Sequence, residues 1–404
     1  MRSVVFAAPF LLETSLRFAR AAARLPDVRL LAVVQEPPPH ADRSIFADVV
    51  EVADCFSVPQ LIEAIERLRA RHGQPHRIVG VLEPLQVQLA KARAHFGVEG
   101  TDEDTADLFR DKARMKDRLR QAGLPVARHA LLGDAGEAAA FEASVGYPMV
   151  VKPPAGMGAK ATFRVRSGDE LRAALTGMSA SAAHPILAEE FLQGEEGSFD
   201  TITLGGVVQH SSISRYLPTP LEVLENPWIQ WRCVLPAQID GPEYDEVRRV
   251  GTAAIEILGL RDGFTHMEWF RRADGSIAIG EIAQRPPGAN ITRMIGLADD
   301  FDPYRAWARA VIDGAFDGPH PRRHAVGCAY LRGMGRGRVA GCSGVHAAQE
   351  AVGHLVVETL LPTPGAPRND SYEGDGYALV RSESTDEVIR ALQTIIETVR
   401  VHYL

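Results

Sequence analysis

The chain has 404 residues, 46% hydrophobic and 24% charged, a composition typical of a globular protein with two or three domains. Its formal net charge of −8 argues against a broad nucleic-acid-binding surface. The four cysteines form no C-x-x-C pair, which favours a reducing compartment such as the cytoplasm over a disulfide framework or a zinc site. Apolar runs stay below the roughly 18 residues of a membrane span, so no membrane partner is expected.

Residues 1–97 alternate short apolar runs with helical patterns, which predicts a small doubly wound α/β domain. Glu13 interrupts the N-terminal apolar run, which indicates a strand followed by an amphipathic helix and not a signal peptide. The first strand is followed by AAPF and not by G-x-G-x-x-G, which argues against a dinucleotide site. The expected strands cover 3–8, 28–34 and 77–82, and the expected helices cover 12–25, 60–72 and 85–96.

A polar hinge then leads into one predicted helix over residues 105–122, which Gly123 ends. Lys112 and Lys116 lie four residues apart on this helix and share a face, as ordinary solvated charges also would.

The next segment, YPMVVKPPAGMGAKATFRVRS, predicts a glycine-containing loop between two strands. Gly156 and Gly158 allow backbone N–H groups to turn toward an anion, and Lys152 and Lys160 add positive charge. Phosphate binding is the functional interpretation, and a plain hairpin turn is the alternative. The loop is not a Walker A motif, because G-x-x-x-x-G-K-[ST] and the following helix are missing. The two strands are expected at 149–152 and 162–165.

The middle of the chain contains strands at 186–191 and 198–204, followed by a segment with little periodicity at 211–239. That segment has four prolines and two tryptophans, and its length predicts an irregular functional loop. A helix over 247–258 follows, and Gly259 ends it.

Residues 264–270 and 276–282 are strand-forming runs on either side of Asp-Gly, the strongest short-range signal of a hairpin. With a two-residue turn, Glu268 pairs with Glu281. Directly opposite residues share one face of a sheet, with Cβ atoms roughly 5 Å apart, so a cation should lie between the two carboxylates. Oxygen ligands without His or Cys favour Mg²⁺.

The alternative is a solvated hairpin whose two glutamates are ordinary surface residues. Apolar neighbours on both faces argue against it, because they would enclose the carboxylates, which then need a partner. A longer turn would shift the register by one residue and place the two glutamates on opposite faces. The apolar neighbours are Phe264, Met267, Trp269, Ile277, Ile279 and Ile282.

The order of these features resembles the ATP-grasp superfamily over nearly the whole chain. The residues that carry the resemblance are Lys112, Lys152, the run Glu189-Glu190-Phe191-Leu192, Glu196, Glu268 and Glu281-x-x-x-Arg285. The resemblance implies an ATP-grasp fold of the α/β and α+β class. It places an N-terminal Rossmann-like domain at 1–97, an ATP-grasp domain at 98–320 with a small lobe at about 124–192, and a C-terminal α+β subdomain at 321–404 that completes the acceptor site.

The resemblance further implies ATP as the cofactor, with Mg²⁺ or, in its place, Mn²⁺. Lys112 and Lys152 would bind the α and β phosphates. The loop that would close over the β and γ phosphates contains Gly156, Met157, Gly158 and Lys160. The hinge that would recognise adenine contains Glu189, Glu190, Phe191 and Leu192, and Glu196 would accept the ribose hydroxyls.

In the same comparison Glu268 and Glu281 would hold the metal, and Arg285 would face the transferring phosphoryl group or the acyl phosphate. Many members of the superfamily have Asn two residues past the second Glu, where this chain has Ala283. The metal shell would then rely on the two glutamates, water and phosphate. His266 shares a strand face with Glu268 and could contact substrate or act as a base, and a purely structural histidine fits equally well.

The run RPPGANI resembles the carboxylate–amine ligase branch, which includes L-amino-acid ligases. The implied reaction joins a small-molecule carboxylate, such as an amino acid, to an amine through an acyl phosphate, with release of ADP and phosphate. The alternatives are an ATP-binding sensor or partner-binding module without ligase activity, and a carboxylase similar to biotin carboxylase. Members of the family usually dimerise through the N-terminal domain, so a homodimer is the expected state.

The acceptor pocket is expected between residues 215–231, His266 and residues 286–290. Aromatic residues there suggest an apolar moiety in the substrate, although packing is their commoner role. The candidate substrate contacts are Arg215, Trp228, Trp231, Gly288, Asn290 and Arg332. Arg336 and Arg338 are further candidates for a substrate carboxylate, and all three C-terminal arginines are also compatible with solvated charges.

Overall fold

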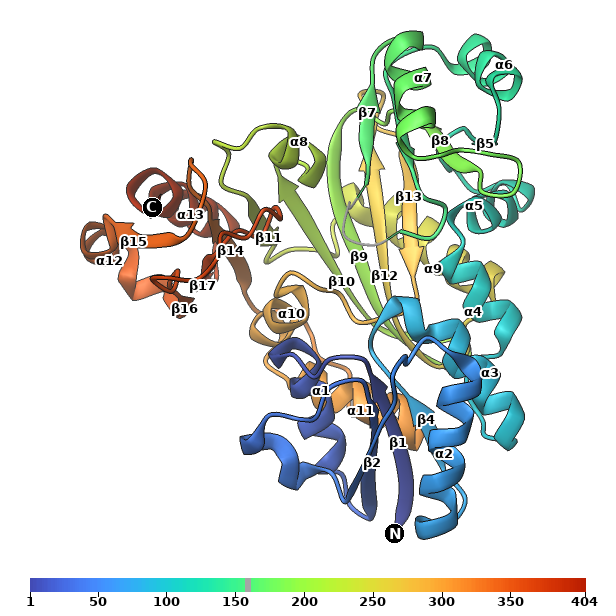
Figure 1. Cartoon of the computed structure of the whole chain (residues 1–404). Coiled ribbons are helices and arrows are strands. Elements are labelled where there is room, and N and C mark those ends of the chain that lie inside the picture. Colours follow the sequence, from blue (N-terminus) through green and yellow to red (C-terminus); the bar gives the residue numbers. More distant parts are fainter. Residues whose placement is uncertain (157–160) are drawn as a thin grey trace.

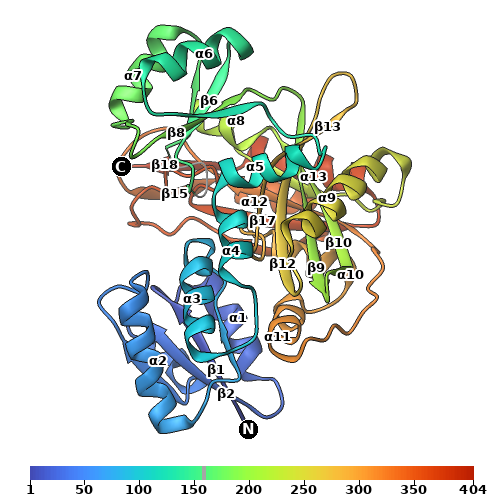
Figure 2. The ribbon, with the colours of Figure 1, turned by 90° about the vertical axis from the view of Figure 1, so that its right-hand side faces the viewer.

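The computed structural model describes residues 1–156 and 161–404 (Figure 1). The expected loop residues Met157, Gly158 and Lys160 lie outside these ranges. Figure 2 shows the N-terminal domain at one end of the molecule and a small lobe at the other, with helices α4 and α5 between them. None of the described helices combines the length and apolar character needed to cross a membrane.

The N-terminal domain is a parallel sheet with strand order β3-β2-β1-β4 and a hydrophobic core on each face, as the alternating pattern predicted. Its strands are β1 (Arg2–Ala8), β2 (Val28–Val34), β3 (Asp48–Glu51) and β4 (Arg77–Val79). Its helices are α1 (Glu13–Ala23), α2 (Val58–His72), α3 (Gln86–Phe96) and the 3-10 turns η1 (His40–Ile45) and η2 (Glu83–Leu85).

A helix from far along the chain completes this domain. Helix α11 (Pro303–Asp313) packs beside α1, where the rings of Phe18 and Trp307 meet edge to face with centroids 5.2 Å apart. Arg2 and Asp313 form an ion pair at 2.7 Å on the same side. The N-terminal domain therefore includes α11, a helix that lies about 200 residues past the boundary expected at residue 97.

The single helix expected over residues 105–122 is wrong, because the chain forms two helices there. These are α4 (Glu103–Arg110) and α5 (Lys112–Gln121). Asp111 between them has extended backbone, and its carboxylate accepts the N–H groups of Ala113 and Arg114 at 2.9 and 3.0 Å. An N-cap in the middle of a continuous helical pattern therefore starts a new helix at Lys112.

The small lobe is an antiparallel sheet with strand order β5-β8-β6-β7, covered by two helices. Its strands are β5 (His129–Leu132), β6 (Met149–Lys152), β7 (Phe163–Val165) and β8 (Ile186–Glu190). Its helices are α6 (Ala135–Val145) and α7 (Gly168–Gly177).

The body of the molecule is one eight-stranded sheet with strand order β13-β12-β9-β10-β11-β14-β17-β16. Its strands are β9 (Glu195–Leu204), β10 (Val207–Leu217), β11 (Arg232–Leu235), β12 (Gly263–Arg271), β13 (Ile277–Ala283), β14 (Ala325–Leu331), β16 (Val356–Leu360) and β17 (Gly376–Ser382). Its helices are α8 (Pro220–Glu225), η3 (Pro242–Tyr244), α9 (Asp245–Leu258), α10 (Ile291–Asp299), α12 (Val345–Val352), η4 (Gly353–Leu355) and α13 (Thr385–Thr398). A separate pair of strands, β15 (Val339–Ser343) and β18 (Arg400–Tyr403), lies at the C-terminal end.

The large sheet bears on two predictions from the sequence, the loop at 211–239 and the domain boundary at residue 320. The irregular loop expected at 211–239 is wrong, because the segment contains the end of β10, helix α8 and strand β11. Residues 233–235 of β11 are fully buried between two neighbouring strands, so the strand lacks the polar alternation that would reveal it. The domain boundary expected at residue 320 falls within one continuous sheet, because β14 pairs with β11 and is followed in the sheet by β17 and β16.

The hairpin of β12 and β13 has the expected pairing of Glu268 with Glu281, but by a different route. The N–H of Arg272 donates to the carbonyl of Ser276 at 2.8 Å, so the turn has three residues and not two. That turn alone would place Glu268 opposite Gly280. Gly280 of β13 has no partner in the pairing, because Glu268 pairs with Glu281 and Trp269 pairs with Ile279. This bulge on β13 shifts the register by one residue and returns the two glutamates to one face.

Candidate active site

A cavity of about 180 Å³ lies between the small lobe and the large sheet and brings together most of the predicted residues. The predicted residues that line it are Lys112, Lys152, Gly156, Glu189, Glu190, Phe191, Leu192, Glu196, Trp231, His266, Glu268, Glu281, Arg285 and Gly288. The small lobe, the hairpin and the loop before α10 therefore contribute to one site, although they are far apart in the sequence.

Glu189 lies between two lysines at the floor of this cavity. Its carboxylate oxygens are 3.1 Å from Lys116 Nζ and 2.9 Å from Lys152 Nζ. Burial would raise the pKa of Glu189, but the two lysines outweigh burial and lower it. Two cations therefore hold the carboxylate of Glu189, the residue for which the resemblance implies a contact with adenine.

Lys116 is the lysine that the sequence prediction did not select. It is fully buried, does not line the cavity, and donates to the carbonyl of Gly280 as well as pairing with Glu189. Burial lowers its pKa, although the nearby glutamates oppose this shift. The i,i+4 spacing from Lys112 showed that both lysines share a face, and only the packing shows which one reaches the cavity.

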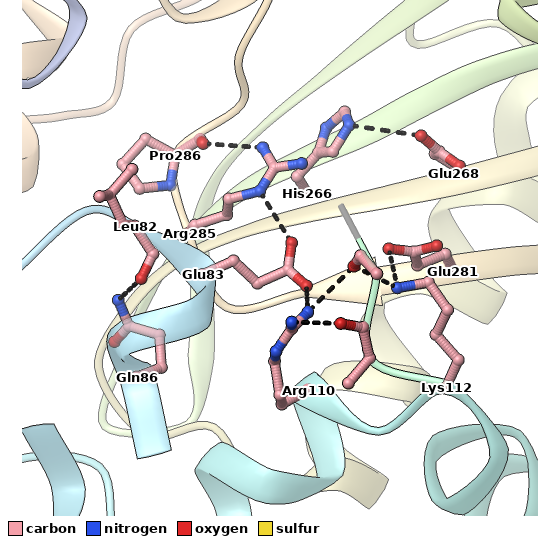
Figure 3. Close-up of polar contacts among 12 residues, drawn as sticks. Leu82, Glu83, Gln86, Arg110, Lys112, His266, Glu268, Glu281, Arg285 and Pro286 are labelled. Atoms are coloured by element: carbon pink, nitrogen blue, oxygen red, sulfur yellow. Dashed lines mark hydrogen bonds and ion pairs between the residues drawn. The ribbon is translucent and has the colours of Figure 1, made fainter. Parts of the chain in front are cut away.

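Lys112 connects the loop after β6 to the hairpin. Its ammonium is 3.0 Å from a carboxylate oxygen of Glu281 and donates to the carbonyl of Gly156 at 2.9 Å (Figure 3). Lys112 and Lys152 lower the pKa of Glu281 to about 2, against the effect of burial. Glu281 is therefore ionised, with a positive group on one side.

Among the described residues, the ion-pair partner of Glu268 is His266, whose Nε2 lies 3.9 Å away, and no lysine or arginine pairs with this carboxylate. Burial and the negative charge of Glu281 raise its pKa, and burial together with the charge of Glu268 raises the pKa of Glu196. Two facing carboxylates of this kind fit a divalent cation, whose charge would relieve the repulsion. Among the described residues there is no cluster of three or more His, Cys, Asp or Glu placed to hold a metal, so the pair would supply two carboxylates to a shell completed by water and phosphate.

His266 has a buried partner that the sequence prediction missed. Its Nδ1 is 2.6 Å from Oδ1 of Asp200, the residue facing it on β9, and Oδ2 of Asp200 accepts a 2.6 Å hydrogen bond from Ser198. The Nε2 atom is 3.9 Å from Glu268 and borders the cavity. An acidic residue in the middle of the strand expected at 198–204 was the signal for Asp200 in the sequence.

Arg285 is held by a residue of the N-terminal domain. Its Nε lies 3.3 Å from Glu83 Oε2, while Arg110 donates to the other oxygen of Glu83 at 2.7 Å (Figure 3). Arg110 also donates to the carbonyl of Gly156 at 2.9 Å. Glu83, only 2% exposed, thus links the arginine of the site to the loop after β6. The position of Glu83, after β4 in the run VLEP, could have marked it as a site residue.

Four predicted substrate residues do not line the cavity. Trp228 is 65% exposed, and Arg215 pairs with Glu195. Arg332 is buried and donates to the carbonyls of Val223 and Ile229, which is a structural role. Asn290 is the N-cap of α10, next to the cavity-lining residues Gly288 and Ala289. Arg336 and Arg338 also lie outside the lining.

The fold and this site define a class. Residues 117–291 match the model of the ATP-grasp domain, and this range contains Lys152, the hinge, the facing glutamates and Arg285, while Lys112 and Lys116 precede it. The chain therefore carries an ATP-grasp domain and has the ATP-grasp fold.

Particular relatives are ligases. The L-arginine-specific L-amino acid ligase of Bacillus subtilis is 29% identical over 257 residues, which cover 62% of this chain and 61% of that protein. The chain thus matches about three fifths of this relative's length. The crystal structure of an L-amino acid ligase from Bacillus licheniformis covers 100% of this chain and 99% of its own, with 17% identity and a TM-score of 0.81. Carboxyaminoimidazole ribonucleotide synthase from Aspergillus clavatus, solved with ATP, covers 98% of both chains with 18% identity and a TM-score of 0.71.

Proposed function

We propose that the protein is an ATP-dependent carboxylate–amine ligase that joins amino acids or closely related small molecules. The observation that carries this proposal is the facing pair Glu268 and Glu281 in the same cavity as Lys112, Lys152 and Arg285. A chain that only bound nucleotide would need the lysines and the hinge, but not a facing carboxylate pair beside an arginine. The relatives named as amino acid ligases support the same reaction class.

The reaction would proceed in two displacements. An oxygen of the substrate carboxylate attacks the γ-phosphorus of ATP, the bond between the β–γ bridging oxygen and the γ-phosphorus breaks, and ADP leaves. The nitrogen of the amine then attacks the acyl carbon, the bond to the phosphate oxygen breaks, and phosphate and one proton are released. Such chemistry depends on positioning and charge neutralisation, and not on a covalent nucleophile.

The residues of this chain would divide that work. Lys112 and Lys152 would neutralise phosphate oxygens, and Arg285 would face the acyl phosphate with a planar, permanently charged fork. Glu268 and Glu281 would hold Mg²⁺, or Mn²⁺ in its place, which when bound supplies positive charge to the phosphates. His266, oriented by Asp200, would accept the proton of the attacking amine at Nε2.

Phosphate release from ATP tests this proposal. The full chain is incubated with ATP and Mg²⁺ and with amino acids offered singly and in pairs, including arginine because of the name of the Bacillus subtilis relative. We expect phosphate release that depends on amino acids, stops on addition of EDTA and returns with excess Mg²⁺. The product should be an amide of two amino acids, identified by mass spectrometry.

Other outcomes would favour the alternatives. Phosphate release that depends on bicarbonate, and not on amino acids, would indicate a carboxylase. ATP binding without phosphate release under any of these conditions would indicate a sensor or partner-binding module.

We also propose that the protein is a homodimer. Sedimentation at the mass of a monomer would contradict this proposal.

A further inference from the structure

The end of the cavity beyond Glu268 and Arg285 is a wall of aromatic and aliphatic side chains. Tyr216 comes from β10, Trp231 from the connection to β11, and Tyr372 from the loop before β17. Leu221 of α8 and Ile291 of α10 complete the wall. Five separate segments therefore converge on one apolar surface inside the site.

This wall is rigid because its rings pack against one another. Trp231 stacks on Tyr330 with centroids 4.7 Å apart and 24° between planes, and it meets Tyr216 and Tyr372 edge to face at 5.2 and 4.8 Å. The indole N–H donates to the carbonyl of Pro218 at 2.9 Å, which fixes the ring. Tyr330 in turn donates to the carbonyl of Ala289, so the loop that borders the cavity is held by the same cluster. Preformed aromatic surfaces of this kind recognise apolar groups at low entropic cost.

The wall adjoins the reacting centre directly. Glu268, Tyr216 and Tyr372 all line this one cavity. Arg285, which would face the acyl phosphate, lines the same cavity. An amino acid whose reacting group sits at Arg285 and Glu268 would therefore place its side chain against the wall.

Within the part of the chain that the structure describes, the wall itself contains no acidic side chain. Among the described residues that line the cavity, the acidic ones are Glu189, Glu190, Glu196, Glu268 and Glu281, and all belong to the nucleotide and metal part. Glu373, next to Tyr372 in the sequence, is outside the lining. A cationic side chain at the wall would be desolvated without an ion pair, which is unfavourable.

Given the proposed ligase function, on which this step rests, we infer that at least one of the two joined amino acids has an aliphatic or aromatic side chain, seated against Tyr216, Leu221, Trp231 and Tyr372. The site discriminates against lysine and arginine at that position.

A substrate panel tests the inference with the unmodified chain. Each of the twenty amino acids is paired with each other one, and kcat/KM is measured from phosphate release. We expect the best pairs to contain leucine, methionine or phenylalanine, and pairs of two charged amino acids to be at least tenfold slower. The best pairs being formed from charged amino acids would overturn the inference and leave the ligase proposal intact. Release with no amino acid at all would contradict both.

A variant of α8 provides the second test. Leu221→Glu places a carboxylate at the wall on a half-buried position, so it should fold. We expect kcat/KM for pairs with leucine or phenylalanine to fall at least tenfold and the relative rate with arginine or lysine to rise, while KM for ATP stays within about twofold. The matched control is Leu224→Glu, the same change on the same helix outside the lining, which should behave like the unmodified chain.

The variant could also contradict the inference. A large rise in KM for ATP in Leu221→Glu, with unchanged discrimination among amino acids, would show that the wall holds part of the nucleotide. Equal effects of Leu221→Glu and Leu224→Glu would show that α8 acts through stability, which would also overturn the role given to Leu221. Thermal unfolding of both variants is measured alongside.

Discussion

The two ends of the active-site cavity are built by different means. The charged centre consists of lysines and glutamates on regular elements, such as Lys152 at the end of β6 and the Glu268–Glu281 pair on a hairpin. The aromatic wall combines Trp231 and Tyr372, from connections between strands, with side chains from three different regular elements, β10, α8 and α10. Under the proposed function, the charged centre would hold the groups that every substrate of the reaction class shares, and the wall would meet the part that differs between substrates.

This difference predicts how each region responds to change. A substitution in the charged centre should reduce turnover of all substrates alike, because it removes charge that the transition state needs. A substitution in the wall should change which amino acid reacts fastest and leave ATP binding nearly unchanged. The predictions below test the charged centre and its supports, from the largest expected effect to the smallest.

Glu281→Gln should have the largest effect. The change keeps the shape of the side chain but removes the negative charge that would face the metal, so kcat should fall about 10³-fold for every amino acid pair. Circular dichroism should show an unchanged fold. The control is Glu350→Gln on the exposed face of α12, which should leave kcat unaltered. Turnover of Glu281→Gln near the unmodified rate would exclude its assignment as a metal ligand.

Lys116→Met tests the support beneath the charged centre. The substitution removes one of two cations from the buried carboxylate of Glu189 and leaves the carbonyl of Gly280 without its donor. We expect the free energy of unfolding in urea to fall by about 3 kcal/mol. Lys91→Met, which breaks an exposed pair with Glu103, should change it by less than about 0.5 kcal/mol. Equal losses in the two variants would mean that the buried pair does not stabilise the site.

Glu83→Gln separates positioning from binding. It weakens the hold on both Arg285 and Arg110 without touching the cavity lining. We expect kcat to fall about tenfold while KM for ATP stays nearly constant. The reason is that Glu83 would act by positioning Arg285, and a misplaced Arg285 would stabilise the transition state less without weakening the binding of ATP. Thermal unfolding serves as the control for stability. A change in KM for ATP with constant kcat would place Glu83 in nucleotide binding and not in the positioning of Arg285.

Trp228→Ala should have the smallest effect, although the sequence marked this residue as a substrate contact. The side chain is 65% exposed and lies outside the cavity lining. Its removal should leave kcat/KM for apolar amino acids within about twofold. A loss of kcat/KM comparable to that of Leu221→Glu would show that Trp228 also contacts the substrate and belongs to the aromatic wall.

Local patterns predicted much of the fold. The strand at 28–34 and the strand at 149–152 have the predicted bounds, because apolar runs between turn residues report strands directly. The break at Asp111 and the buried strand β11 were not predicted, since an N-cap inside a helical pattern and a strand without polar alternation give no local signal. The hairpin pairing was predicted correctly although the turn was not, because the bulge at Gly280 of β13 corrects the register.

The sequence by itself determined which charged groups the site would contain, since the order of the lysines, the hinge and the two glutamates is a property of the chain. Only the tertiary structure decided which lysine reaches the cavity, that Glu83 holds Arg285 across 202 residues, and that Asp200 orients His266. It also decided that the cavity ends in an aromatic wall. The physical reason is that a sequence motif shows only which residue types lie near one another along the chain. Burial, ion pairing and ring packing arise between segments that only folding brings together.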